Sequence, residues 1–184
     1  MNKRVALAGI LICLGAIFRL IPHPHNFTPI GAMALVGGLY IGSKYLAFAI
    51  PLVSLFISDL VLNNTINKVF FDETGFIVWA DFMTYTYLAM GLTVLLGFYL
   101  SKKSMTAKII GGGLFASVMF FLITNFGAWL GSGLYPKNFG GLLTCLGAGV
   151  PFFSKTLLSN FLFTSIFVVS IEGVFRNVPE SVEA

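Results

Sequence analysis

Residues 19–31 (RLIPHPHNFTPIG) hold the side chains in this chain that are best suited to chemistry. They combine a guanidinium, two imidazoles, an amide and a hydroxyl with three prolines. Two histidines this close can ligate a metal or move a proton, but His23 and His25 have no neighbouring carboxylate or cysteine to complete a site. We therefore expect no metal and no cofactor, and interpret both imidazoles as hydrogen-bonding groups. Because proline lacks an N–H and restricts the residue before it, the stretch should be a stiff, extended loop.

More polar side chains fall at the ends of apolar segments on the same side of the membrane as this loop. Polar groups at membrane depth are expensive and usually face the protein interior or a wet cavity. Their convergence at one end predicts a binding site that opens outward. The candidate binding residues are Arg19, His23, His25, Asn26, Asp59, Asn63, Asp81, Asn125, Trp129, Tyr135, Cys145 and Asn160.

Several charged and aromatic residues also have simpler roles, which stay open at this point. Arg19 could snorkel to the membrane interface, or it could pair with Asp59 or Asp81. Asp59 could form a structural ion pair or contact a ligand. Trp129 could belong to the aromatic belt at the interface. Glu172, in the inner half of the last apolar segment, has a simple partner in the arginine four residues later.

The composition places the chain in a membrane. Only 10% of its residues are charged and 57% are apolar, with a mean hydropathy of +0.92, whereas soluble domains have roughly a quarter charged residues. The eleven Lys and Arg residues are scattered, which argues against a nucleic-acid partner. Cys13 and Cys145 are far apart, so we expect neither a disulfide nor a redox pair. P-loop, nucleophile-elbow and H-E-x-x-H motifs are absent, and we expect no enzyme.

We expect one transmembrane domain over residues 1–184, built only of α-helices. A spanning helix needs about 20 apolar residues, and six segments approach that length. Lys44 separates two of them, which joined together would be too long for the bilayer. The expected helices are residues 5–21, 26–42, 45–62, 79–101, 109–130 and 154–175. The expected outer loops are residues 22–28, 63–78 and 131–153.

The distribution of positive charge predicts the orientation of these helices. Seven of the eleven Lys and Arg residues fall on the side of the N-terminus, and four fall on the other side. Positive charge concentrates on the cytoplasmic side of membrane proteins. We therefore expect both termini in the cytoplasm and the three longer loops outside.

The first helix carries small residues along one stripe, Ala6, Gly9, Cys13 and Ala16. Such stripes let two helices approach closely in lipid. The partner could be another helix of this chain or a different protein, including a second copy.

Two segments, 24–33 (PHNFTPIGAM) and 50–60 (IPLVSLFISDL), resemble the first loop and third helix of the S-components of energy-coupling-factor (ECF) vitamin transporters. Residues 19–31, 124–129 (TNFGAW) and 141–153 resemble more closely an uncharacterised family of bacterial integral membrane proteins (DUF6580-like) that is similar to those S-components. The resemblance covers nearly the whole chain.

The resemblance implies a multi-pass protein of the bacterial inner membrane that takes up a vitamin-sized ligand. Its extracytoplasmic pocket would be capped by the first, third and fifth loops. Many S-components present an Ala-x-x-x-Ala stripe to an ECF energising module. Here the stripe reads Gly9-x-x-x-Cys13, which leaves room for a solitary transporter. Cobalamin is a candidate ligand, because the side chain of Cys145 or His23 could ligate its cobalt.

Two other functions stay open beside uptake. A membrane-embedded enzyme would use Arg19, His23, His25 and either Asp59 or Asp81, and it predicts an open cleft that reaches the lipid. A structural subunit of a membrane assembly predicts no enclosed cavity. An uptake protein predicts a closed apolar and aromatic pocket near the outer face, lined from the first, third and fifth loops. The form of the outer half of the molecule therefore distinguishes the three functions.

Overall fold

The computed structural model describes residues 3–71 and 75–175, and in these ranges all regular structure is helical, with no strand. The elements are α1 (Lys3–Phe18), α2 (Ile30–Tyr40), α3 (Lys44–Asn63), the 3₁₀ helix η1 (Ile66–Phe70), α4 (Asp81–Leu100), the π-helical turn η2 (Ala107–Gly111), α5 (Gly112–Gly131) and α6 (Phe139–Val174). The prediction of an all-α chain with six α-helices is thereby confirmed for the described residues.

Four of the described helical segments are long and apolar enough to cross a membrane: Lys44–Asn63, Asp81–Leu100, Ala107–Gly131 and Phe139–Val174. The other two helices are shorter. At about 1.5 Å per residue, α1 with 16 residues is about 24 Å long and α2 with 11 residues about 16 Å, against a hydrocarbon core of about 30 Å. The fold is therefore compatible with a multi-pass membrane protein.

The largest departure from the predicted elements concerns the last outer loop. The predicted loop 131–153 is wrong from Phe139 onward, because α6 begins there and runs for 36 residues. The Asn138 side chain caps this start by accepting a hydrogen bond from the N–H of Gly141 at 2.9 Å. The glycines of this stretch disfavour a helix in isolation. One of them, Gly149, lets α6 pack closely on α5, because a Cβ atom there would lie 2.4 Å from Asn125 Oδ1. That packing outweighs the low helix propensity.

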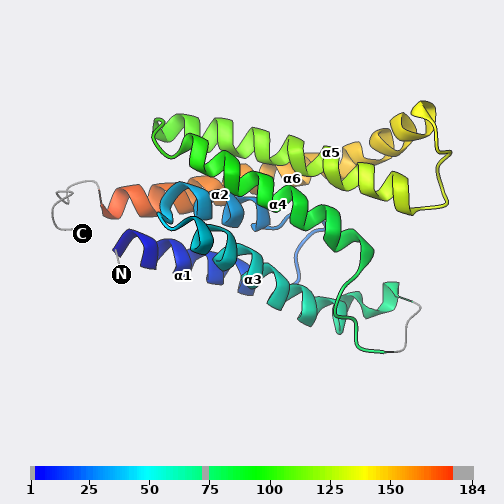
Figure 1. Ribbon diagram of the computed structural model, residues 1–184, viewed down its shortest axis with the longest axis horizontal. Coiled ribbons are helices and arrows are strands. Elements are labelled where there is room, and N and C mark those ends of the chain that lie inside the picture. Colours follow the sequence, from blue (N-terminus) through cyan, green and yellow to red (C-terminus); the bar gives the residue numbers. More distant parts are fainter. Residues whose placement is uncertain (1–2, 72–74, 176–184) are drawn as a thin grey trace.

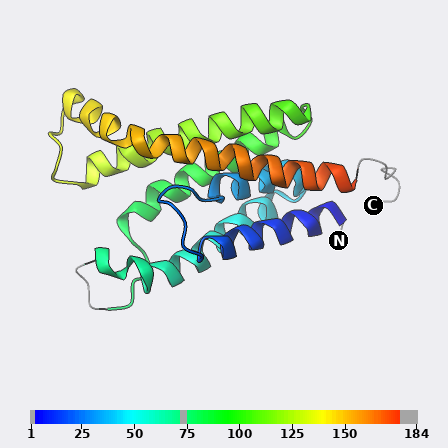
Figure 2. The same ribbon diagram turned by 180° about the vertical axis from the view of Figure 1, so that it is seen from behind.

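α2 is the central helix of the bundle. Ten of its eleven residues are buried, and it packs against α1, α3, α4, α5 and α6. Figures 1 and 2 show from opposite sides that it lies among the other helices, with the start of α1 and the end of α6 at the same end of the bundle. The predicted start of this helix at residue 26 is wrong, because Pro29 stands at the cap and Ile30 is the first helical residue.

The backbones of α2 and α4 touch at a pair of glycines. A Cβ atom on Gly38 would lie 2.0 Å from the carbonyl oxygen of Val94. A Cβ atom on Gly97 would lie 2.5 Å from the carbonyl oxygen of Leu35. Small residues allow this kind of approach between helices in a membrane.

Replacing Gly38 with alanine should push α2 away from α4. Because the added methyl group meets backbone rather than a movable side chain, we expect a loss of roughly 1–3 kcal/mol, typical of overpacking. The measurement is the thermal unfolding temperature of the purified chain in detergent. Gly91→Ala, in the neighbouring helix α4, is the matched control, since its Cβ would meet only a Phe48 ring carbon at 3.9 Å. Equal unfolding temperatures for the two variants would contradict the close packing.

A partly buried ion pair joins three elements near the end of α6. Lys108 Nζ lies 2.6 Å from Glu172 Oε1, and the Tyr40 hydroxyl donates a hydrogen bond to the same oxygen at 2.8 Å. The predicted partner of this glutamate, Arg176, lies outside the described residues. Lys108 belongs to η2, a π-helical turn in which one extra residue enters the helix. The pairing keeps both charges from being buried alone.

The side-chain amide of Asn64 joins the last turn of α3 to the residues just before α4. Asn64 Nδ2 donates hydrogen bonds to the carbonyls of Leu60 at 2.9 Å and Ile77 at 2.8 Å, and its Oδ1 accepts one from the N–H of Ile77 at 2.8 Å. Part of the predicted loop 63–78 is helical, because η1 lies within it. This segment leads directly into the start of α4.

Candidate functional site

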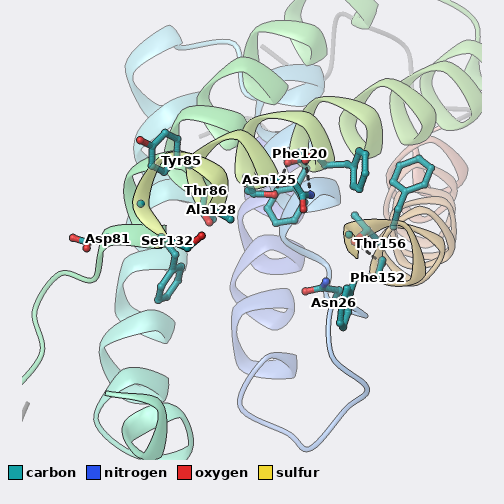
Figure 3. A pocket seen from close by; sticks show the side chains of 17 residues that line it. Asn26, Asp81, Tyr85, Thr86, Phe120, Asn125, Ala128, Ser132, Phe152 and Thr156 are labelled. Carbon is teal, nitrogen blue, oxygen red and sulfur yellow. Dashed lines mark hydrogen bonds between the residues drawn. The ribbon is translucent and has the colours of Figure 1, made fainter. Parts of the chain in front are cut away.

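The α4–α6 cavity, as we name it, has a volume of about 480 Å³ and lies between α4, α5, α6 and the segment before α2. It is partly open and combines aromatic rings with amides and hydroxyls. Figure 3 shows the labelled side chains approaching it from these elements. The lining residues are Asn26, Asp81, Phe82, Tyr85, Thr86, Phe120, Phe121, Thr124, Asn125, Gly127, Ala128, Gly131, Ser132, Gly149, Phe152, Phe153 and Thr156. Size and lining are typical of a small-molecule site.

Helical periodicity places these residues on common faces. On α5 they begin at Phe120 and recur at intervals of three and four up to Gly131, with Ser132 next in the chain. On α6 the same spacing joins Gly149, Phe152, Phe153 and Thr156. Two adjacent helices thus present facing walls, and the first turns of α4 close a third side.

Two glycines bring the walls together. A Cβ atom on Gly127 would lie 2.2 Å from the ring of Tyr85, and one on Gly149 would lie 2.4 Å from Asn125 Oδ1. The amide of Asn125 is also held from its own helix, because its Nδ2 donates to the carbonyl of Phe121 at 2.7 Å. The amide therefore has a fixed position in the wall.

A narrow recess of about 10 Å³ adjoins the α4–α6 cavity and shares Asn26, Phe120 and Thr156 with it. Thr28 and Asn160 also line the recess. Asn160 is only 2% exposed, and its Nδ2 donates to the hydroxyl of Ser117 at 2.9 Å. A space this small holds one water-sized group.

Two hydroxyls around these spaces have unfilled hydrogen-bonding capacity. Among the described residues, the buried Oγ1 of Thr28 in the recess and the buried Oγ of Ser132 in the cavity wall have no hydrogen-bond partner. Buried polar atoms are normally satisfied, and an unpartnered one calls for an explanation such as water or a ligand. Both atoms belong to residues that line a space where such a partner fits.

Arg19 and Asp59 form a second ion pair, which is buried and lies outside the α4–α6 cavity. Arg19 Nη2 lies 2.6 Å from Asp59 Oδ1, and its Nη1 donates to the hydroxyl of Ser58. The Tyr87 hydroxyl donates to Asp59 Oδ2 at 3.0 Å. The two charged side chains are 12% and 3% exposed. Of the roles left open for these residues, the structure gives Arg19 a pairing with Asp59 that ties the end of α1 to α3 and α4.

The structure brings five of the twelve predicted site residues to the α4–α6 cavity or next to it. Asn26, Asp81 and Asn125 line the cavity, and Asn160 lines the recess. Cys145 lies behind the wall, 3% exposed, with its Sγ 3.4 Å from the carbonyl oxygen of Asn125.

The other predicted site residues lie elsewhere. The Nδ1 atom of His23 is 2.6 Å from the carbonyl oxygen of Ile21, and His25 is exposed. Asn63 is buried with its Nδ2 3.5 Å from the sulfur of Met83. Trp129 donates its Nε1–H to the carbonyl of Pro136 at 2.9 Å. Arg19, Asp59 and Tyr135 are likewise outside the lining residues of the α4–α6 cavity.

The twelve predicted site residues leave out the phenylalanine walls and the hydroxyl residues of the lining. These are Phe82, Phe120, Phe121, Phe152, Phe153, Tyr85, Thr86, Thr124, Ser132 and Thr156. The spacing of phenylalanines and threonine over residues 149–156 is a helical signal, but it is hidden when the stretch is assigned to a loop. In the part of the chain that the structure describes, no three His, Cys, Asp or Glu side chains gather as a metal site.

Comparison with known proteins gives one match. A family model described as a family of unknown function (DUF6580) matches residues 1–181. No curated protein and no solved structure matches the chain.

Proposed function

The chain belongs to this family of unknown function, DUF6580, and we propose that it is a membrane uptake protein that binds a small, vitamin-like molecule. The α4–α6 cavity is the binding site in this proposal. The protein is a multi-pass component of the bacterial inner membrane and resembles the S-components of ECF vitamin transporters.

One observation carries the proposal: a cavity of about 480 Å³ lined by phenylalanines, amides and hydroxyls, beside two buried hydroxyls without a partner. Apolar walls with a few placed polar groups are the usual design of a small-molecule site. Neither Cys145 nor His23 lines this cavity. Its lining therefore gives no support to cobalamin as the ligand.

The distribution of charge supports an outward-facing site. Lys3, Lys44, Lys102 and Lys103 stand at or next to the helix ends that lie towards the start of α1. The α4–α6 cavity is formed by the opposite ends of α4 and α5. With positive residues in the cytoplasm, this cavity opens outside, and all six α-helices contribute to the transmembrane domain with both termini inside.

The small-residue stripe of α1 supports docking to another protein. Ala8, Ile12 and Gly15 form the buried face of α1, whereas Cys13 is exposed and a Cβ atom on Gly9 would meet nothing within 4 Å. Ala16 of the stripe packs against the core of the chain, whereas Gly9 and Cys13 are open for an energising module or a second copy of the chain.

The enzyme alternative has less support. Arg19 and Asp59 are bound to each other, and neither of them nor His23 or His25 lines the α4–α6 cavity. Asp81 does line this cavity, which is partly open rather than closed, but it has none of the other three groups beside it there. A catalytic group needs to lie within hydrogen-bond reach of its substrate.

The proposed function is tested by thermal unfolding of the purified chain with a panel of vitamins and their precursors. A ligand that binds only the folded state raises stability by mass action, by about 2.7 kcal/mol at a concentration one hundred times its Kd. We expect at least one compound to raise the unfolding temperature in proportion to the logarithm of its concentration. An unchanged unfolding temperature with every compound would count against uptake of such molecules.

A further inference from the structure

We infer that the molecule bound in the α4–α6 cavity is a flat ring compound that carries no net negative charge, either neutral or cationic. The inference rests on the proposed function, because it concerns the ligand of the same site. It follows from the charges, the rings and the neutral polar groups of the lining.

The lining contains one charged residue, and it is acidic. Asp81 is the acidic residue among the lining residues, and none of them is Lys, Arg or His. Asp81 begins α4, where a carboxylate also favours the helix dipole, and it is exposed. An anion that entered the cavity would lose water without gaining a cationic partner, and it would meet this carboxylate.

The walls are built from aromatic rings. Phe120 and Phe121 of α5 and Phe152 and Phe153 of α6 all line the α4–α6 cavity. The rings of Phe121 and Phe153 touch, with centroids 5.0 Å apart and 52° between the ring planes, so the two helices share one aromatic wall. Flat rings pack well against such a wall, and the negative faces of aromatic rings attract organic cations.

The remaining polar groups are neutral and can both donate and accept hydrogen bonds. The unpartnered hydroxyls of Thr28 and Ser132 are of this kind. The recess beside Thr28 measures about 10 Å³, enough for one small substituent such as an amino or hydroxyl group. Such groups select a polar substituent without requiring a negative charge.

Two residues that could attract an anion lie near this site but outside its lining. Lys137 is exposed, and its ammonium donates hydrogen bonds to the carbonyls of Trp129 and Ser132, the second at 2.6 Å. It therefore holds the end of α5, where carbonyls lack helical partners. His25 precedes Asn26 in the chain and is exposed.

The test uses three indole probes of nearly equal size: tryptamine, a cation; tryptophol, which is neutral; and indole-3-acetate, an anion. Dissociation constants are measured by ligand-detected NMR on the full chain in a neutral detergent. We expect indole-3-acetate to bind at least about tenfold more weakly than the other two, the effect of one like charge at a partly hydrated site. The Asp81→Asn variant should bind tryptamine more weakly, with an affinity close to that for tryptophol. The Lys137→Gln variant should bind the three probes in the same order of affinity as the unaltered chain.

Each outcome decides the inference, and the outcomes separate it from the proposed function. If indole-3-acetate binds as tightly as the others and a variant that fills the α4–α6 cavity removes its binding, the charge inference is wrong and the site remains. If Lys137→Gln removes an anion preference, the charge inference is also wrong. If no probe binds, the charge of the molecule that co-purifies with the chain tests the charge inference instead. If no such molecule is found, both the charge inference and the proposed function are rejected.

Discussion

Replacing Arg19 with methionine will cost the protein a large part of its stability. The variant leaves Asp59, 3% exposed, with a buried charge. Among the described residues of other helices, it then has only the Tyr87 hydroxyl as a polar partner. Removing one member of a buried ion pair typically costs about 3–5 kcal/mol. At roughly 2–4 °C per kcal/mol for a chain of this size, the unfolding temperature in detergent should fall by about 6–20 °C.

The double variant Arg19→Met with Asp59→Leu separates the burial of a lone charge from the loss of packing. Removing both charges is often nearly neutral, so we expect this variant to recover most of the lost stability. Lys44→Met is the control for a change of net charge, because Lys44 is exposed. If Arg19→Met alone unfolds at the same temperature as the unaltered chain, the ion pair does not tie α1 to α3 and α4.

Replacing Ala128 with tryptophan should abolish ligand binding. Ala128 lines the α4–α6 cavity on α5, between the phenylalanine wall and Ser132, so an indole at this position fills space that the ligand requires. We expect affinity to fall at least about a hundredfold, equivalent to about 2.7 kcal/mol of binding energy. The measurement is the ligand-induced rise in unfolding temperature.

Leu130→Trp is the matched control, because Leu130 lies two residues further along the same helix, is 43% exposed and is not among the lining residues of this cavity. It should bind ligand as the unaltered chain does. Equal binding by the Ala128 variant and this control would place the ligand outside the α4–α6 cavity. A fall in the unfolding temperature of the ligand-free Ala128 variant would be a separate effect on folding, so stability without ligand is measured for both.

The helices of this fold are largely predictable from apolar run length and charge, while the first part of α6, the longest of the described helices, is not. α3 and α4 lie within two residues of their expected bounds, since Lys44 and Asp81 mark their starts. Residues 139–153 read as a loop because they are rich in glycine, which disfavours a helix, and include Pro151. Their helicity depends on packing against α5, which Gly149 approaches closely at Asn125. Local propensity contains no information about that contact.

The candidate site was predictable in part, for the same physical reason. Amides at membrane depth need partners, and this rule correctly drew attention to Asn125 and Asn160, which line the α4–α6 cavity and its recess. It could not separate residues that satisfy each other, such as Arg19 and Asp59, from residues that face a cavity. Nor could it find the phenylalanine walls, since apolar rings in a membrane protein can face lipid, core or ligand equally well.

Native mass spectrometry of the gently purified chain tests most directly the claim that the α4–α6 cavity binds a small molecule. The chain and its Leu130→Trp variant should retain a vitamin-sized molecule that survives transfer from mild detergent. The Ala128→Trp variant, folded and equally pure, should lack it. Loss of the molecule from that variant alone is the result we expect. Retention of the molecule by the Ala128→Trp variant, or its absence from all three proteins, would contradict the claim.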